Sequence, residues 1–226
     1  MERHLILLAS GAGSRFGTNV PKQFVKINGR MIIEYTMAAS DCGMFDEMIL
    51  VVSSPYVDLM ESVARSNQYK VPVRVVEGGS CRKESCERGV AAIQDENGFV
   101  VIHNSVQPFI TEEDYRNSIV ALEKYPAVTS GVPCVYTILE TDGDGVLRRM
   151  APRAQCFGDL GPECFWLPVI RKALELGRND SEFTNLTGLV MKYGLGDIYV
   201  VKGSPRNIKI TYPEDVIYAE RMINGK

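Results

Sequence analysis

Short apolar runs recur along the chain and alternate with longer segments of mixed polarity. Six runs are strand-sized and bounded by turn residues, and they cover residues 5–9, 48–52, 73–76, 99–103, 127–132 and 198–201. Apolar residues at roughly helical spacing between them predict helices over 31–39, 56–66, 83–94 and 112–124. Thr111 and Asp114 are spaced to form a capping box at the start of the last of these. The alternation predicts an α/β fold with a mostly parallel sheet flanked by helices.

One segment breaks this alternation. Residues 135–150, VYTILETDGDGVLRRM, form two strand-like halves around the turn sequence at 142–145, which is a strong hairpin signal. It predicts a hairpin arm that either folds on its own domain or lies against a second subunit. The length of 226 residues favours a single domain, residues 1–226, that includes this arm.

Composition and charge narrow the possible partners. The net charge of −3 lacks the positive footprint that a nucleic-acid partner demands. The first apolar run is far shorter than the roughly 20 residues of a membrane span, so we expect a cytoplasmic protein without a membrane partner. The six cysteines form no C-x-x-C and there are only two histidines, so neither a zinc pattern nor a disulfide framework is recognisable.

The candidate chemistry begins in a glycine-rich loop, LILLASGAGSRFGTNVPKQF, at residues 5–24. It leaves the carboxyl end of the first predicted strand, where α/β folds bind their ligands. The glycines resemble a dinucleotide-binding turn, but Pro21 falls where the first helix would run and no acidic residue follows the second strand to bind a ribose. The P-loop pattern fails because Thr18 follows Gly17.

Two cations remain in this loop, and they suit the phosphates of a nucleotide. Arg15 offers a planar fork of donors and Lys22 a compact charge, a combination suited to a triphosphate. The alternative is a surface loop whose cations are merely solvated.

The pattern LLASGAGSRFG…PKQF resembles the signature loop of the 2-C-methyl-D-erythritol 4-phosphate cytidylyltransferase and ribitol-5-phosphate cytidylyltransferase family. Further segments that resemble this family follow in its order, namely GGSCRKESC at 78–86, VVIHNSVQPFI at 100–110, the hairpin arm, and NIKIT at 207–211. The resemblance spans nearly the whole chain. It implies a Rossmann-like nucleotidyltransferase fold with a protruding β-hairpin arm, and a homodimer in which the arm completes the neighbour's site.

The resemblance also implies a reaction and the residues that perform it. A cytidylyl group would pass from CTP to a polyol or sugar phosphate with release of pyrophosphate, aided by Mg²⁺, and such transfer depends mainly on positioning and on cations. The implied catalytic residues are Arg15, Lys22 and Lys209. The implied nucleotide-binding residues are Ala9, Ser10, Gly11, Ala12, Gly13, Gly79, Arg82, Ser85 and Asn104. Ser85 considered alone is typical of an exposed serine near the start of a helix.

The chain departs from the family pattern at the implied metal site and in the arm. Asn104 stands where the family has an aspartate that helps to hold magnesium, and Gln107 stands where it has an arginine. The cations available for the acceptor phosphate are Arg148, Arg149 and Arg153. Two alternatives stay open: a relative that binds nucleotide without turnover, which the neutral residues favour, and a dinucleotide-dependent oxidoreductase.

Overall fold

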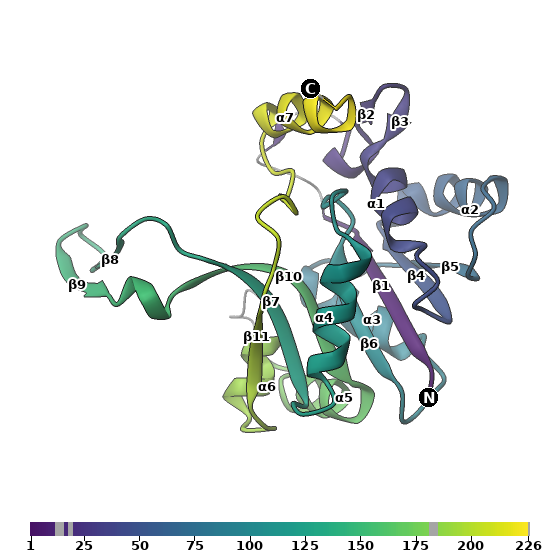
Figure 1. Cartoon of the computed structure of the whole chain (residues 1–226). Helices are drawn as coiled ribbons and strands as arrows, with labels where there is room; N and C mark the ends of the chain where they lie inside the picture. Colours follow the sequence, from purple (N-terminus) through teal and green to yellow (C-terminus); the bar gives the residue numbers. More distant parts are fainter. Residues whose placement is uncertain (12–15, 18–19, 181–184, 226) are drawn as a thin grey trace.

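A seven-stranded sheet forms the centre of the computed structural model, which describes residues 1–11, 16–17, 20–180 and 185–225 (Figure 1). The strand order is β11-β7-β10-β6-β1-β4-β5. The strands are β1 (Arg3–Ala9), β4 (Glu47–Val52), β5 (Val73–Glu77), β6 (Phe99–Asn104), β7 (Ala127–Pro133), β10 (Phe157–Trp166) and β11 (Ile198–Lys202). All neighbours pair in parallel except β10, which is antiparallel to β6 and β7. The six predicted strands and the α/β fold class are confirmed, and the parallel strands end at one edge.

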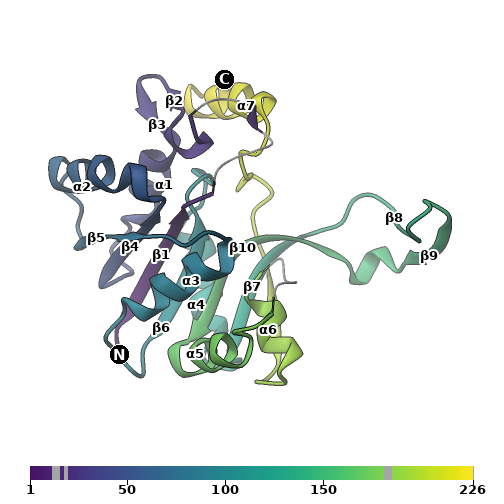
Figure 2. The same ribbon diagram turned by 180° about the vertical axis from the view of Figure 1, so that it is seen from behind.

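Helices cover both faces of the sheet, because neighbouring residues of each buried strand point to opposite sides. Leu5 and Leu7 pack in one core cluster and Ile6 in the other. One face is covered by α1 (Ile32–Ser40), α2 (Val57–Ser66) and α4 (Glu112–Ala121), and the other by α3 (Arg82–Ala91), α5 (Leu167–Leu176) and α6 (Thr187–Lys192) (Figures 1 and 2). Within the described ranges, no helix is both long and apolar enough to cross a membrane.

A smaller cluster closes the end of the molecule above the carboxyl edge of the sheet. The strands β2 (Lys26–Ile27) and β3 (Arg30–Met31) form a tight hairpin whose turn residues, Asn28 and Gly29, have positive φ angles of 50° and 82°. The hairpin lies beside α7 (Pro213–Ile223), and Ile27, Ile210 and Ala219 are buried together there (Figure 1). The carboxyl-terminal segment is thereby brought over the end of β1.

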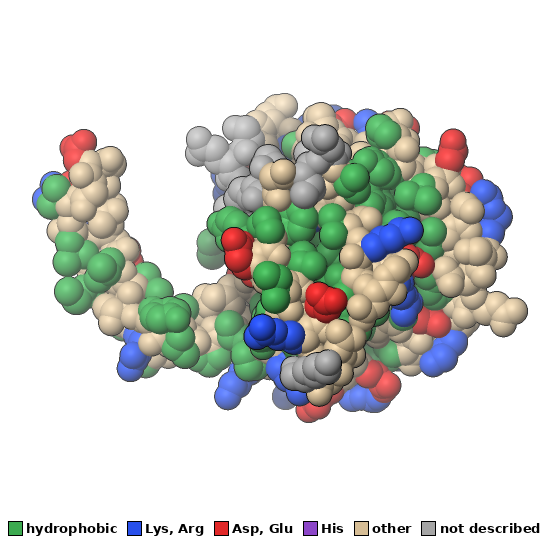
Figure 3. All heavy atoms as spheres, turned by 90° about the horizontal axis from the view of Figure 1, so that it is seen from above, with side chains coloured by type: hydrophobic (Ala, Val, Ile, Leu, Met, Phe, Trp, Pro, Cys, Tyr) green, Lys and Arg blue, Asp and Glu red, His purple; other side chains and the backbone are tan. Residues whose placement is uncertain are grey.

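The predicted arm is present and projects away from the body (Figures 1 and 3). It consists of β8 (Ile138–Thr141) and β9 (Leu147–Ala151), which pair antiparallel, and it returns to β10 through a 3-10 turn at Arg153–Gln155. Its hydrophobic side chains are largely exposed: Val135, Tyr136, Leu139, Val146, Leu147 and Met150. The arm leaves β7 at the same edge of the sheet at which β1 and β6 end.

The predicted capping box at the start of α4 is confirmed. The Asp114 amide donates to the Thr111 hydroxyl at 3.2 Å, and the Thr111 amide donates to the Asp114 carboxylate at 3.0 Å. Two amide groups at the start of α4 therefore gain partners that its own turns do not supply.

Thr111→Ala is expected to lower the free energy of unfolding by about 1 kcal/mol, since the cap hydroxyl is lost while the fold is kept. Urea denaturation followed by circular dichroism measures the change. Asn117→Ala is the matched control, because Asn117 is exposed in the middle of the same helix. Equal stability of Thr111→Ala and the parent protein would show that the cap contributes nothing.

Candidate active site

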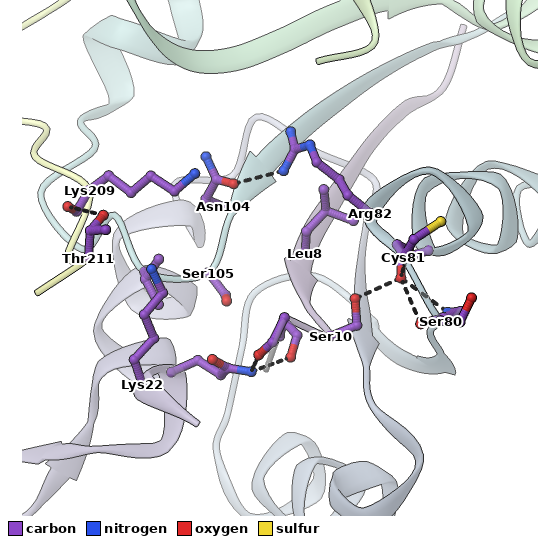
Figure 4. Close-up of a pocket in the computed structure, with 16 residues that line it drawn as sticks. Leu8, Ser10, Lys22, Ser80, Cys81, Arg82, Asn104, Ser105, Lys209 and Thr211 are labelled. Atoms are coloured by element: carbon purple, nitrogen blue, oxygen red, sulfur yellow. Dashed lines mark hydrogen bonds between the residues drawn. The ribbon is translucent and has the colours of Figure 1, made fainter. Parts of the chain in front are cut away.

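A cavity of about 330 Å³ lies at the carboxyl edge of the sheet, where β1 and β6 end (Figure 4). The loop before α3 and the segments around Lys22 and Lys209 complete its walls. Most of the residues predicted for the site line it, namely Ala9, Ser10, Gly11, Lys22, Gly79, Arg82, Ser85, Asn104 and Lys209. The predicted residues Ala12, Gly13 and Arg15 lie outside the described residues. Topology thus gathers segments from nearly the whole length of the chain at one place.

Two lysines enter the cavity from segments far apart in the sequence. Lys22 begins a 3-10 turn, Lys22–Phe24, and its Nζ donates to the carbonyl of Ile210 at 2.7 Å. Figure 4 shows the Lys209 side chain extending toward Asn104. Lys22 is half-buried and hydrogen-bonded to the carboxyl-terminal segment. It is therefore not a solvated surface cation, which was the alternative for this loop.

Gln23 is a residue of the site that the sequence prediction missed. Its side chain is 2% exposed, and Nε2 donates to the carbonyls of Ala9 at 2.6 Å and Gly11 at 3.0 Å. These carbonyls belong to the point where the chain leaves β1. Gln23 therefore fixes the start of the glycine-rich loop. The PKQF sequence places it directly after Lys22, which was the only available signal.

Ser85 is not an exposed serine, as its position near the start of α3 suggested, but is 1% exposed. Its hydroxyl accepts from the Ser10 hydroxyl at 2.7 Å and the Gly79 amide at 3.1 Å, and donates to the Cys81 carbonyl at 2.9 Å. Ser85 lines the cavity while it joins the end of β1 to the loop before α3. Gly79 is needed in that loop, because a Cβ there would lie 2.3 Å from the Glu84 side chain.

A chain of polar side chains crosses the floor of the cavity. Arg82 donates to the Asn104 side-chain oxygen at 3.0 Å, and the Asn104 amide nitrogen donates to the Gln107 oxygen at 2.6 Å. The Gln107 nitrogen donates in turn to the carbonyls of Leu160 at 2.8 Å and Asn207 at 3.2 Å. Gln107 is fully buried and therefore positions the segment that carries Lys209 rather than facing a ligand.

Glu163 anchors the other end of this chain and is also absent from the predicted site. Its carboxylate lies 3.1 Å from the Arg82 guanidinium and accepts from the Thr187 amide at 2.9 Å. Burial raises the pKa of Glu163, while Arg82 and the amide oppose that shift. A second cavity of about 110 Å³ adjoins the first here and is lined by Arg82, Asn104, Asp159, Glu163 and Lys209, among others.

Several groups that carry chemistry elsewhere are inert in this fold. His103, in the motif before Asn104, is 1% exposed, and burial lowers its pKa to about 4, so it is neutral near pH 7. Burial raises the pKa of Cys86 to about 12 and also raises that of Cys164. None of the six cysteines is in a disulfide. The site therefore relies on cations and on amide groups.

The three arginines predicted for the acceptor do not reach the cavity of their own chain. On the arm, Arg148 pairs with Asp142, and Arg149 donates to Glu140 at 2.9 Å. Arg153, at the base of the arm, donates to the carbonyl of Val135 at 3.3 Å. The described residues that line the two cavities include none of these arginines.

Comparison with known proteins gives a consistent result over the whole length. The model of the 2-C-methyl-D-erythritol 4-phosphate cytidylyltransferase family matches residues 3–225. The Clostridium novyi protein of that name is 32% identical over 226 residues, covering 97% of this chain and 96% of the relative. A bifunctional ribulose 5-phosphate reductase/CDP-ribitol pyrophosphorylase from Haemophilus influenzae is 31% identical, and the match covers 98% of this chain and 48% of that longer protein.

A solved structure supports the same assignment. The 4-diphosphocytidyl-2C-methyl-D-erythritol synthase from Anaerococcus prevotii superposes with a TM-score of 0.87 at 26% identity, covering 99% of this chain and 98% of the other. The family match spans every segment that forms the cavity, and it replaces the alternative of a dinucleotide-dependent oxidoreductase. The chain belongs to the 2-C-methyl-D-erythritol 4-phosphate cytidylyltransferase family and is a nucleotidyltransferase.

Proposed function

We propose that this cytidylyltransferase binds CTP in the cavity at the ends of β1 and β6 and transfers CMP to the phosphate of a polyol or sugar. The observation that carries the proposal is that Lys22 and Lys209, which are 187 residues apart, line one cavity together with the ends of two parallel strands. The carboxyl edge of an α/β sheet is where such folds bind ligands. The whole chain would act as a single nucleotidyltransferase domain in the cytoplasm.

The reaction needs charge stabilisation more than proton transfer. An oxygen of the acceptor phosphate attacks the α-phosphorus of CTP, a P–O bond forms, and the bond to the leaving pyrophosphate breaks. Negative charge grows on the oxygens around phosphorus, so cations held beforehand in position lower the barrier. We assign the α-phosphate to Lys22 and Lys209 and the leaving phosphates to Arg15.

Backbone groups would recognise the nucleoside. The end of β1 and the turn after it offer Ala9, Ser10 and Gly11, with Ala12 and Gly13 following in sequence. Gly79 lies beside Ser10, because the Ser85 hydroxyl bonds to both residues. Gln23, which donates to the carbonyls of the first segment, and Ser85, which accepts from the Gly79 amide, hold these two backbone segments in place. A pyrimidine base read by a rigid backbone is recognised with little loss of side-chain entropy.

The family acts with a divalent cation, and we propose magnesium. Asn104 is a poor ligand for it, because its oxygen already accepts from the Arg82 guanidinium and an amide brings no charge. The described residues that line the main cavity include no carboxylate. Magnesium would therefore be held mostly by the phosphates of the nucleotide, with Asn104 as at most a neutral neighbour.

The arm would supply the acceptor site of a second copy. Arg148, Arg149 and Arg153 lie on or beside a projecting hairpin whose apolar side chains have no cover in one chain, with Tyr136 80% exposed and Met150 61% exposed. A homodimer that exchanges arms would cover these side chains and bring the arginines to the partner's cavity. The relatives' names suggest 2-C-methyl-D-erythritol 4-phosphate or ribitol 5-phosphate as the acceptor.

A second candidate is a nucleotide-binding relative without turnover. The specific observation in its favour is the neutral pair Asn104 and Gln107, which stands at the floor of the cavity without a carboxylate. The two candidates agree on CTP binding and differ in pyrophosphate release, which the next experiment measures.

Lys22→Ala and Lys209→Ala are each expected to lower kcat by about a hundredfold, since one preorganised charge-stabilising group commonly contributes roughly 3 kcal/mol in the transition state. Pyrophosphate release from CTP with each candidate acceptor gives the rates. Lys26→Ala and Lys202→Ala are matched controls on exposed lysines and should keep the parent rate. Parent-like turnover in both folded site variants would contradict the assigned roles, and absence of turnover in the parent with tight CTP binding would favour the second candidate.

Asn104→Asp is expected to lower the magnesium concentration for half-maximal rate and to cost about 1–3 kcal/mol of stability. In the parent protein the amide nitrogen of Asn104 donates to the Gln107 oxygen at 2.6 Å. In the variant a carboxylate oxygen takes the place of that nitrogen, so two oxygens face each other and the hydrogen bond is lost. The side-chain amide of Gln107 cannot flip to offer its nitrogen to the new carboxylate, because that nitrogen donates to two carbonyls.

A magnesium titration at fixed CTP and urea denaturation measure the two effects. The matched control is Asn117→Asp on the exposed face of α4. Unchanged magnesium dependence would show that residue 104 does not contact the metal. Unchanged stability would show that the Gln107 amide is not held in one orientation.

The protein is expected to be a dimer at micromolar concentration, and Leu139→Asp with Met150→Asp should convert it to a monomer. These two residues pair across β8 and β9 and are 56% and 61% exposed, so two carboxylates there would be buried by a partner at high cost. Light scattering gives the mass of each protein. Ile217→Asp, at an exposed apolar residue of α7, is the control and should stay dimeric. A monomeric parent protein would rule out the arm exchange.

A further inference from the structure

A second cluster of titratable groups lies at the opposite edge of the sheet, where β1 begins. Glu2 directly precedes β1 and His4 is the second residue of that strand, so the two residues, two positions apart, point to the same side. Asp95 comes from the loop between α3 and β6. One ligand atom of each lies within 4.8 Å of the others. The cavity is lined by residues at the carboxyl end of β1. Figure 1 shows the amino terminus at the opposite end of this strand, so the cluster is separate from the nucleotide site.

His4 is buried and one of its ring nitrogens lacks a partner. The side chain is 2% exposed, and Nδ1 lies 2.8 Å from the Glu47 carboxylate. Among the described residues, neither His4 Nε2 nor the buried Asp95 Oδ2 makes a hydrogen bond. Buried polar atoms nearly always find a partner, so two such atoms that face each other indicate a missing ligand.

The separations of these atoms fit a shared metal ion. Nε2 of His4 lies 3.6 Å from the Glu2 carboxylate and 3.8 Å from the Asp95 carboxylate. Both separations are too long for good hydrogen bonds. Two ligands at the usual zinc distance, in tetrahedral geometry, lie about 3.4 Å apart. The observed spacing therefore needs an adjustment of only a few tenths of an ångström.

The surroundings of His4 favour a metal-binding ring. Glu47 holds Nδ1 and is itself held by the Arg74 guanidinium at 2.8 Å. A metal-ligating histidine typically donates its other ring N–H to a carboxylate in this way, which fixes the tautomer with the Nε2 lone pair directed outward. The Asp95 carboxylate is also held in position, because its Oδ1 accepts from the Asn97 amide at 3.2 Å.

We propose that Glu2, His4 and Asp95 bind one zinc ion that ties the start of β1 to the loop before β6. An imidazole with two carboxylates suits zinc better than magnesium, which prefers oxygen ligands alone. Glu2 is the exposed ligand, with its side chain 63% exposed, so water completes the coordination. The site is structural and takes no part in the transfer reaction.

Calorimetric titration of the EDTA-treated full-length protein with zinc chloride tests the proposal. One equivalent should bind with micromolar affinity, and zinc at about a hundredfold over Kd should raise Tm by about 5 °C. Glu2→Gln and Asp95→Asn should each weaken binding at least tenfold, and Glu47→Gln should do so by about 10- to 100-fold. His4 is buried, so these carboxylate variants, rather than a histidine variant, carry the test.

Two controls separate this site from other zinc ligands. Cys81→Ser removes an exposed thiol and Glu96→Gln an adjacent exposed carboxylate, and both should bind zinc like the parent. Turnover with CTP should be unchanged in Asp95→Asn, so failure of the proposed function leaves this test intact. Absence of saturable binding would overturn the proposal. Equal affinity of the parent, Glu2→Gln and Asp95→Asn would overturn it as well.

Discussion

The hydrogen bond between the side chains of Asn104 and Gln107 is the interaction on which the geometry of the nucleotide cavity depends. Through Arg82, which lies on α3, it reaches Glu163. Through the carbonyls of Leu160 and Asn207, which accept from Gln107, it reaches β10 and the segment before Lys209. One amide pair thereby holds four segments that are remote in sequence. A charged pair of side chains could also join these two positions. With the neutral Asn104 and Gln107, however, neither position offers a carboxylate to a metal ion.

The cavity combines this neutral amide pair with the cations Lys22 and Lys209. Lys22 and Lys209 approach from segments that contact each other through the Ile210 carbonyl, so the two positive charges are held near one another before any ligand arrives. Holding like charges together costs stability, and a triphosphate offsets that cost when it binds. Positive charges held in position before the reaction stabilise the negative charge that develops during transfer at phosphorus.

The buried parallel strands could be predicted because their faces are both covered, which leaves continuous apolar runs. Strand β10 was not among the predicted strands, because Gly158, Gly161, Pro162 and the buried Glu163 interrupt its apolar residues. The lysines of the site followed from charge in a glycine-rich loop and from the family resemblance. Gln23 and Glu163 did not, since a buried polar residue is identified only by its partners, and those lie on other segments.

The claim that this cavity performs cytidylyl transfer is tested most directly by pyrophosphate release with four nucleoside triphosphates against a panel of polyol and sugar phosphates, with magnesium present. The account predicts release that requires both CTP and one phosphorylated polyol or sugar, with little release from UTP, ATP or GTP. Release without an acceptor, or equal release from all four nucleotides, would contradict it.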